Sequence, residues 1–247
     1  MRSTRSAFET RSSGVLRSRL LAVALLALAG NPVQALIFYH TGDASHNRES
    51  APAGPWAGSG WRYQGLFRSF LGTMISPRHF VTAAHIAPNG STFTHKAYFS
   101  GTGKSTFYLI NPNVNEGTGY WTIPGSDLRI FEIYGEFPYY APLYAGSDEA
   151  GKDLVVMGRG RPRGEEVRRF GQLRGWQWAP GDQRVRWGTN RVDSIFADSD
   201  SGDFLVFDFD AAAESDECQA AVGDSGGAIF LQEDGTWKLA GILSAVD

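Results

Sequence analysis

The sequence predicts an all-β protein whose strands pair antiparallel in a sandwich or barrel. From Phe67 onward, short apolar runs alternate with breaks rich in Gly, Pro and Asp, as in antiparallel all-β folds. Glycine occurs 30 times, aromatic residues make up 13% of the chain, and few stretches show a helical period. The length of 247 residues fits one large β domain, two small domains or an α/β barrel, and the short alternating runs favour the β arrangements.

The expected elements can be followed in order along the chain. Residues 36–65 are rich in Gly, Ser, Ala and Pro, which predicts an extended lead-in and no packed element. Strands are then expected in the runs FLGTMIS, FVTAA, FYLI, DLRIFEI, DLVVMG, FLVFDF, GAIFLQ and WKLAGILSAV. Two polar stretches, 158–169 and 193–204, are expected to be exposed loops.

Residues 1–35 have the features of a secretory signal peptide. Arginines precede the apolar run LLAVALLALAG, and the small residues Val33 and Ala35 precede an expected cleavage after Ala35, with Ala29 as the second choice. The run is too short to span a bilayer comfortably, so we expect a secreted or periplasmic mature chain with no membrane segment. Losing five Arg and one Glu would change the formal net charge from −3 to −7.

Composition and spacing argue against several other classes of partner. Charge is nearly balanced, with 23 Lys and Arg against 26 Asp and Glu, and no basic stripe indicates a nucleic-acid partner. The cluster Asp193, Asp198, Asp200 and Asp203 has enough carboxylates for calcium, but its spacing matches no EF-hand loop. A solvated face is the favoured interpretation, so the sequence predicts no metal and no cofactor.

Cys218 is the only cysteine, so no intrachain disulfide can form. It lies seven residues before Ser225, but we interpret it as a small buried apolar residue and assign it no chemistry.

The stretch Gly223-Asp224-Ser225-Gly226-Gly227 precedes an apolar run. A simple turn is one interpretation; a nucleophilic serine is the other. Such a serine needs a base, a group that orients the base, and backbone N–H donors for the oxyanion. Of five histidines, His85 follows the turn and strand of SPRHFVTAAH, and Asp127 directly precedes the run LRIFEI. These two residues are the candidate base and orienting carboxylate.

The motifs TAAH, DLRIFEI and GDSGGAIF, in the order His, Asp, Ser, resemble the trypsin/chymotrypsin-like serine proteases. The separations of 42 and 98 residues are also similar to that family's, whereas other triad families use other orders. The resemblance extends from Phe67 to Val246. It implies two packed antiparallel six-stranded β-barrels with the triad at their seam.

The resemblance also implies roles for individual residues. Ser225 would be the nucleophile, His85 the general base and then acid, and Asp127 the group that orients His85. The N–H groups of Gly223 and Ser225 would form the oxyanion hole, and Ser244 would border the buried aspartate. The expected domains are a signal peptide at 1–35, a lead-in and N-terminal barrel at 36–140, and a C-terminal barrel at 141–247.

Several positions depart from the family pattern. Phe70 and Ile86 stand where the family has a disulfide beside the histidine, so we expect their side chains to touch. Gln219, six residues before Ser225, and Val246 are the tentative substrate-binding residues beside Ser244. Gln219 does not favour tryptic specificity, and Val246 would narrow the pocket entrance. Because the chain ends at Asp247, the second barrel is expected to be incomplete.

The predicted function is a secreted serine endopeptidase that hydrolyses peptide bonds of proteins or peptides through an acyl-enzyme. The alternatives are a catalytically silent, protease-like binding protein and a secreted serine esterase. Cleavage after Ala35 would also expose an apolar N-terminus, Leu36-Ile37-Phe38. We expect the Leu36 amine to neutralise Asp224, the alternative being that an internal donor does so.

Overall fold

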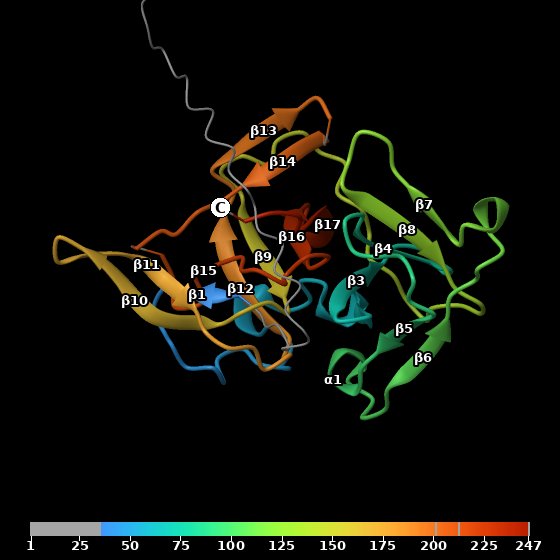
Figure 1. The fold of residues 1–247 in the computed structure, drawn as a ribbon, viewed down its shortest axis with the longest axis horizontal. Coiled ribbons are helices and arrows are strands. Elements are labelled where there is room, and N and C mark those ends of the chain that lie inside the picture. The colour runs from blue at the N-terminus through green and yellow to red at the C-terminus, as the bar shows by residue number, and fades with distance from the viewer. Residues whose placement is uncertain (1–35, 201, 212, 247) are drawn as a thin grey trace, which may run out of the picture. The chain divides into compact units, whose positions relative to one another are not determined.

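The computed structural model describes residues 36–200, 202–211 and 213–246, and the predicted signal peptide lies outside them. Its regular secondary structure is almost wholly β-strand, and the strands pair antiparallel in every ladder between two strands. Figure 1 shows two larger sheets, one formed early and one late in the sequence. The antiparallel all-β class predicted from the sequence is confirmed.

The first sheet has seven strands. In spatial order they are β6 (Thr106–Leu109), β5 (Thr92–His95), β2 (Gln64–Phe67), β3 (Phe70–Met74), β4 (His79–Ala83), β8 (Leu128–Glu132) and β7 (Tyr120–Thr122).

Tight turns and an aromatic core form this sheet. Phe67 pairs with Phe70, so only two residues connect β2 to β3, and Arg68 adopts the positive φ of 55° that such a hairpin requires. Inside, the rings of Phe80 and Phe131 stack at a centroid distance of 5.1 Å. Phe67 packs on both, 5.6 and 4.6 Å away. Paired aromatic rings of this kind bury much apolar area and fix the register of their strands.

The second sheet has four strands, in the order β12 (Arg186–Arg191), β9 (Asp153–Gly158), β16 (Ala228–Glu233) and β17 (Thr236–Ile242). One hydrophobic cluster joins the two sheets, since Leu71 and Val81 of the first pack with Val155, Met157 and Phe230 of the second. Residues brought to the edge of this shared core from both sheets can therefore meet.

The remaining strands form two-stranded ladders. These are β1 (Ile37–Phe38) with β15 (Cys218–Gln219), β10 (Arg163–Arg169) with β11 (Gln172–Trp178), and β13 (Ser194–Asp198) with β14 (Gly202–Val206). Helical turns are short: α1 (Ala97–Ser100) and three 3₁₀ turns, Gly54–Trp56, Trp61–Tyr63 and Asn115–Gly117. The strand numbers thus differ in detail from six per barrel, because the later strands divide between a sheet and separate ladders.

Two local predictions were wrong. The lead-in is packed at its start, where Leu36 and Phe38 are 1% and 3% exposed and β1 pairs with β15. Its apolar residues find partners 180 residues further along the chain, which local composition cannot reveal. The stretches 158–169 and 193–204 contain strands β10, β13 and part of β14. They form hairpins, and β10 and β11 project from the second sheet (Figure 1).

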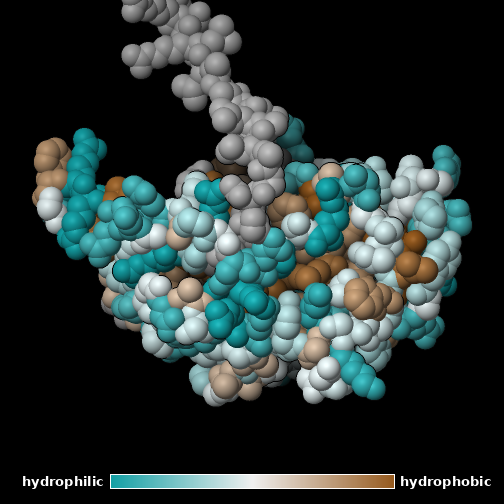
Figure 2. Space-filling view, turned by 60° about the horizontal axis from the view of Figure 1, so that its bottom comes forward, coloured by the Kyte–Doolittle hydropathy of each residue, from teal (hydrophilic) through white to brown (hydrophobic). Residues whose placement is uncertain are grey.

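No helix among the described residues is long and apolar enough to cross a bilayer. In the face shown in Figure 2, hydrophilic residues predominate and hydrophobic ones gather in a smaller central area.

Candidate active site

Strand register brings His85 and Asp127 together. Strand β4 ends at Ala83, which pairs with Leu128, the first residue of β8. The amide of Ala84 donates to the backbone oxygen of Asp127 (2.9 Å), and the amide of His85 donates to Asp127 Oδ1 (2.8 Å). His85 Nδ1 lies 2.6 Å from Asp127 Oδ2. Two neighbouring strand ends therefore fix the imidazole against the carboxylate.

The Asp127 carboxylate is held in its charged form. Ser244 Oγ donates a second hydrogen bond to Oδ2, at 2.6 Å. Burial alone would raise the pKa of Asp127, but the hydrogen bonds from Ser244 and His85 outweigh burial and lower it below its usual value. The carboxylate is therefore ionised at neutral pH. A charged acceptor at Oδ2 favours the imidazole tautomer that carries its proton on Nδ1.

Ser225 meets the other nitrogen of the same imidazole. Ser225 Oγ lies 2.7 Å from His85 Nε2. The glycines that follow are required by space: a Cβ on Gly226, whose φ is +79°, would lie 2.3 Å from the oxygen of Leu71. A Cβ on Gly227 would lie 2.0 Å from the oxygen of Met157. The serine loop can thus approach both sheets only with glycines at these positions.

Asp224 is 2% exposed and anchors the serine loop from inside. Its carboxylate accepts hydrogen bonds from the amides of Gly160 (2.5 Å), Ala221 (2.7 Å) and Leu36 (3.1 Å to Oδ2, 3.4 Å to Oδ1). Burial raises the pKa of Asp224 to about 6, against the opposing effect of these amide donors. The Asp224 carboxylate therefore accepts from Leu36, the neighbour predicted from the sequence, and also from the internal amides of Gly160 and Ala221.

The amides of Gly223 and Ser225 are available to a ligand. In the described part of the chain, neither donates a hydrogen bond to a protein acceptor. Gly223 has a φ of +97°, a conformation that strains any residue with a Cβ. Two free N–H groups beside a serine hydroxyl can stabilise an oxyanion.

The chain matches the family described as Trypsin over residues 49–247. It belongs to the trypsin family. Its fold is accordingly chymotrypsin-like, and with a single cysteine this member has no intrachain disulfide.

Two solved structures are similar in fold to this trypsin-family protein. One is described as the Rv3671c protease in an inactive form, at 16% identity and a TM-score of 0.42, covering 76% of this chain and 83% of that one. The other is an inactive mutant of a chimeric murine norovirus NS6 protease, at 16% identity and a TM-score of 0.40, covering 76% and 88%. No curated protein matches the chain.

The substrate-binding role of the tentative specificity residues stays a prediction. The side-chain amide of Gln219 is engaged by the backbone: Nε2 donates to the oxygen of Phe207 (2.7 Å) and Oε1 accepts from the amide of Ala220 (2.8 Å). Val246 is half-buried and packs against the apolar cluster that contains Leu36. Gln219 would have to give up backbone partners to contact a substrate side chain.

Phe70 and Ile86 occupy one hydrophobic cluster, with Ile86 buried in it and Phe70 packed against it. That arrangement is compatible with the contact predicted between them, which stays a prediction. Cys218 is fully buried, and burial holds the pKa of its thiol well above the usual value. Its predicted role as a small apolar residue agrees with this environment.

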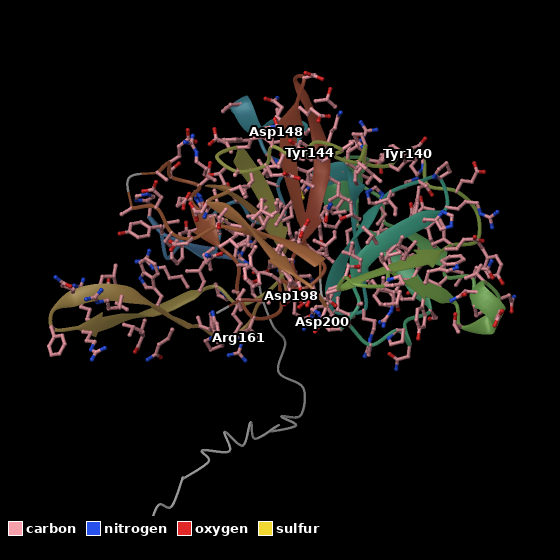
Figure 3. The ribbon with its side chains drawn as sticks, turned by 90° about the horizontal axis from the view of Figure 1, so that it is seen from above. Tyr140, Tyr144, Asp148, Arg161, Asp198 and Asp200 are labelled. Carbon is pink, nitrogen blue, oxygen red and sulfur yellow. The ribbon has the colours of Figure 1, made fainter. Side chains whose placement is uncertain are left out.

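The four aspartates of the acidic stretch do not converge. Asp198 and Asp200 lie at the turn between β13 and β14 (Figure 3), where the amide of Asp200 donates to Asp198 Oδ1. Among the described residues, no group of three or more His, Cys, Asp or Glu side chains is arranged to hold a metal ion.

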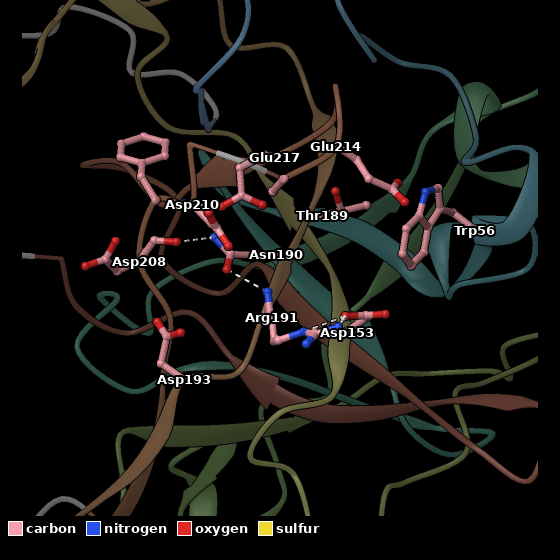
Figure 4. A pocket seen from close by; sticks show the side chains of 12 residues that line it. Trp56, Asp153, Thr189, Asn190, Arg191, Asp193, Asp208, Asp210, Glu214 and Glu217 are labelled. Atoms are coloured by element: carbon pink, nitrogen blue, oxygen red, sulfur yellow. Dashed lines mark hydrogen bonds and ion pairs between the residues drawn. The ribbon is translucent and has the colours of Figure 1, made fainter. Parts of the chain in front are cut away.

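A cavity of about 570 Å³ lies apart from the triad, at the edge of the second sheet (Figure 4). Six carboxylates line it: Asp153, Asp193, Asp208, Asp210, Glu214 and Glu217. Glu217 is 2% exposed, and burial raises the pKa of its carboxyl to about 7. Glu217 is not predicted from the sequence, where its only signal is its place directly before Cys218, which is buried.

Proposed function

We propose that this trypsin-family protein is a serine endopeptidase acting on proteins or peptides, with His85, Asp127 and Ser225 as its catalytic triad. One observation carries the proposal: a single imidazole lies 2.7 Å from a serine oxygen and 2.6 Å from a carboxylate held in its charged form. A nucleophilic serine requires this arrangement, in which a base contacts the hydroxyl and a carboxylate orients the base.

Acylation begins when Ser225 Oγ attacks the carbonyl carbon of the scissile bond. His85 Nε2 accepts the hydroxyl proton as the bond to carbon forms, and Asp127 stabilises the resulting imidazolium through Nδ1–H. The carbonyl oxygen becomes an oxyanion, which the amides of Gly223 and Ser225 stabilise.

His85 then acts as a general acid. It returns the proton to the leaving amine, the C–N bond breaks, and an ester between Ser225 and the acyl part of the substrate remains. Water, deprotonated by the same nitrogen, hydrolyses that ester and restores the hydroxyl of Ser225.

Export supplies the mature N-terminus in this proposal. Leu36 N already lies 3.1 Å from Asp224 Oδ2, so cleavage after Ala35 would place a charged amine beside a buried carboxylate and favour its ionised form. Adding one glycine before Leu36 tests this. The longer chain should lose most activity, whereas unchanged activity would show that the internal amides suffice.

Labelling with a fluorescent fluorophosphonate tests the assignment of the nucleophile. The mature chain should react with one equivalent of reagent at Ser225, located by peptide mass spectrometry, and Ser225→Ala should not react. Ser199→Ala, on the exposed turn after β13, is the matched control and should label like the wild type. A wild-type chain that stays unlabelled would favour the silent binding protein.

A peptide library then separates the two enzymatic alternatives. An endopeptidase should cleave internal amide bonds, whereas an esterase should hydrolyse only ester substrates. N-terminal sequencing of protein collected from the medium or periplasm of an expressing bacterium tests the proposed localisation and should read Leu-Ile-Phe.

A further inference from the structure

The residues at the start of the β10–β11 hairpin contact both the serine loop around Asp224 and the lead-in that follows Leu36. Gly160 and Arg161 precede β10; Gly160 N donates to the Asp224 carboxylate, and Arg161 N donates to the oxygen of Val222 (3.1 Å). Two residues after Arg161, the side chain of Arg163 contacts the lead-in. The same short stretch thus touches both the serine loop and the segment that follows Leu36.

Arg163 holds the lead-in by its carbonyl groups. Its Nη1 donates to the oxygens of Phe38 (3.2 Å) and Tyr39 (2.5 Å). Phe38 is the last residue of β1, which begins directly after Leu36, and Tyr39 follows it. A guanidinium that bonds two successive carbonyls restrains the backbone there more than a single neutral hydrogen bond would.

An aromatic cluster fixes the position of the guanidinium. The Arg163 Cζ atom lies 4.1 Å from the ring centroid of Trp176 on the paired strand β11. Trp176 also packs edge-on against Tyr39 (5.4 Å) and Phe209 (5.3 Å). Arg163 is therefore held between the hairpin and the lead-in, and its position depends on both.

We propose that Arg163 is a positioning residue: by restraining Phe38 and Tyr39 it keeps Leu36 against Asp224, and so keeps the Gly223–Ser225 loop in its catalytic conformation. The inference rests on the proposed function for its kinetic readout only. The chain of contacts runs from Arg163 through β1 to Leu36 N, then to Asp224 and the two oxyanion amides. The projecting hairpin is thereby coupled to the reacting atoms through the lead-in and Asp224.

Arg163→Met in the mature chain tests this, because it keeps an apolar stem over Trp176 and removes both hydrogen bonds. The expected result is a fall in kcat of about tenfold or more with KM changed less than about twofold, since the loop acts in the transition state. Arg163→Lys keeps one donor and the charge, and should recover part of kcat. Arg168→Met, on the same strand, is the matched control, because the side chain of Arg168 donates to the exposed Glu166 and to the oxygen of Gly171, both within the hairpin.

Hydrogen–deuterium exchange supplies a readout that does not depend on activity. In Arg163→Met, exchange should rise at residues 220–225 and at Leu36–Tyr39, and stay unchanged in β16. If Arg163→Met fails to fold, Arg163→Lys and Trp176→Phe carry the same test with smaller effects. Equal kcat and equal exchange in the Arg163 variants and the Arg168 control would overturn the inference. An inert wild type would instead defeat the proposed function and leave the exchange test in force.

Discussion

The two halves of the candidate site are held in place by different means. His85 and Asp127 sit at the ends of two paired strands of one sheet, and the register of β4 against β8 brings them together. Ser225 lies in a loop anchored by a buried carboxylate, whose donors come from Leu36, Gly160 and Ala221. The base half is thus built from contacts about 40 residues apart, whereas the serine half needs a segment 188 residues away.

This difference implies that the serine half is the adjustable part of the site. Strand pairing is cooperative, so the His85–Asp127 contact persists as long as the first sheet is folded. The loop around Ser225 depends instead on whether one buried charge is satisfied, which a single event at the N-terminus can change.

The largest loss of activity is expected from a substitution that changes the chemistry of the His85–Asp127 half without moving its atoms. Asp127→Asn should lower kcat by about 10⁴-fold, because the amide favours the wrong imidazole tautomer and cannot stabilise the imidazolium. Steady-state kinetics on a peptide substrate measure it, with Asp153→Asn, on the exposed start of β9, as the control. A loss below about tenfold would show that Asp127 does not orient the base.

The next largest loss of activity tests whether the two halves are held in place independently. Asp224→Asn should lower kcat by about 100-fold, because the amide places N–H groups against the donors of Leu36 and Ala221 and the oxyanion amides lose their positions. The low-field proton NMR signal of the His85 Nδ1–H should be retained, since that half is fixed by strand register. Loss of this signal together with activity would contradict the independence of the two halves.

A smaller effect tests the link between them. Ser244, beyond the end of β17, donates to Asp127 across the seam. Ser244→Ala should lower kcat about tenfold by removing one hydrogen bond to a charged group. It should also move the pKa of Asp127 upward, towards its usual value, since the Ser244 hydrogen bond is the strongest single interaction that lowers it. Kinetics and carbonyl NMR of labelled aspartate measure both; an unchanged pKa would contradict the assignment.

The smallest effect concerns stability. The pKa of Glu217 is about 7 in the folded protein, against the usual 4.5. The folded state therefore binds this proton more tightly, and the wild type loses stability from this group as pH rises from about 4.5 through 7. Glu217→Gln removes this pH dependence. As pH rises from 4.5 to 8, the free energy of unfolding of the variant should therefore increase by about 1–3 kcal/mol relative to that of the wild type.

Urea unfolding at several pH values measures the effect of Glu217→Gln. Glu214→Gln, in the same cavity but exposed, is the matched control and should leave the slope unchanged. A variant whose stability follows the wild-type pH curve would show that Glu217 does not titrate near neutrality.

The comparison of the halves also explains what the sequence could predict. TAAH, the run after Asp127, and GDSGG are short motifs whose residue types follow from local chemistry and close packing, so the candidate triad could be predicted from them, as the strands could from the apolar runs. The packing of Leu36 and Phe38, the burial of Glu217 and the contact of Arg163 with Tyr39 depend on segments far apart in the chain. The local composition around these residues predicts a loop, because the apolar or charged partner that orders each of them lies far away in the sequence.

The projecting hairpin shows the same limit. Its sequence, GRGRPRGEEVRR, is polar enough to resemble a solvated loop, and most of β10 is exposed. Strand pairing with β11 and the stacking of Arg163 on Trp176 turn it into an ordered element. Composition predicts exposure correctly here but not backbone pairing.

The central claim is that His85 and Ser225 act as one catalytic unit. A double-mutant cycle on kcat/KM tests it most directly, using Ser225→Ala, His85→Ala and the double variant with one peptide substrate. Each single variant should lose about 10⁴-fold or more, and the double variant should lose no more than either, because removing one partner already abolishes the unit. Losses that multiply in the double variant, or a single variant that keeps wild-type activity, would contradict it.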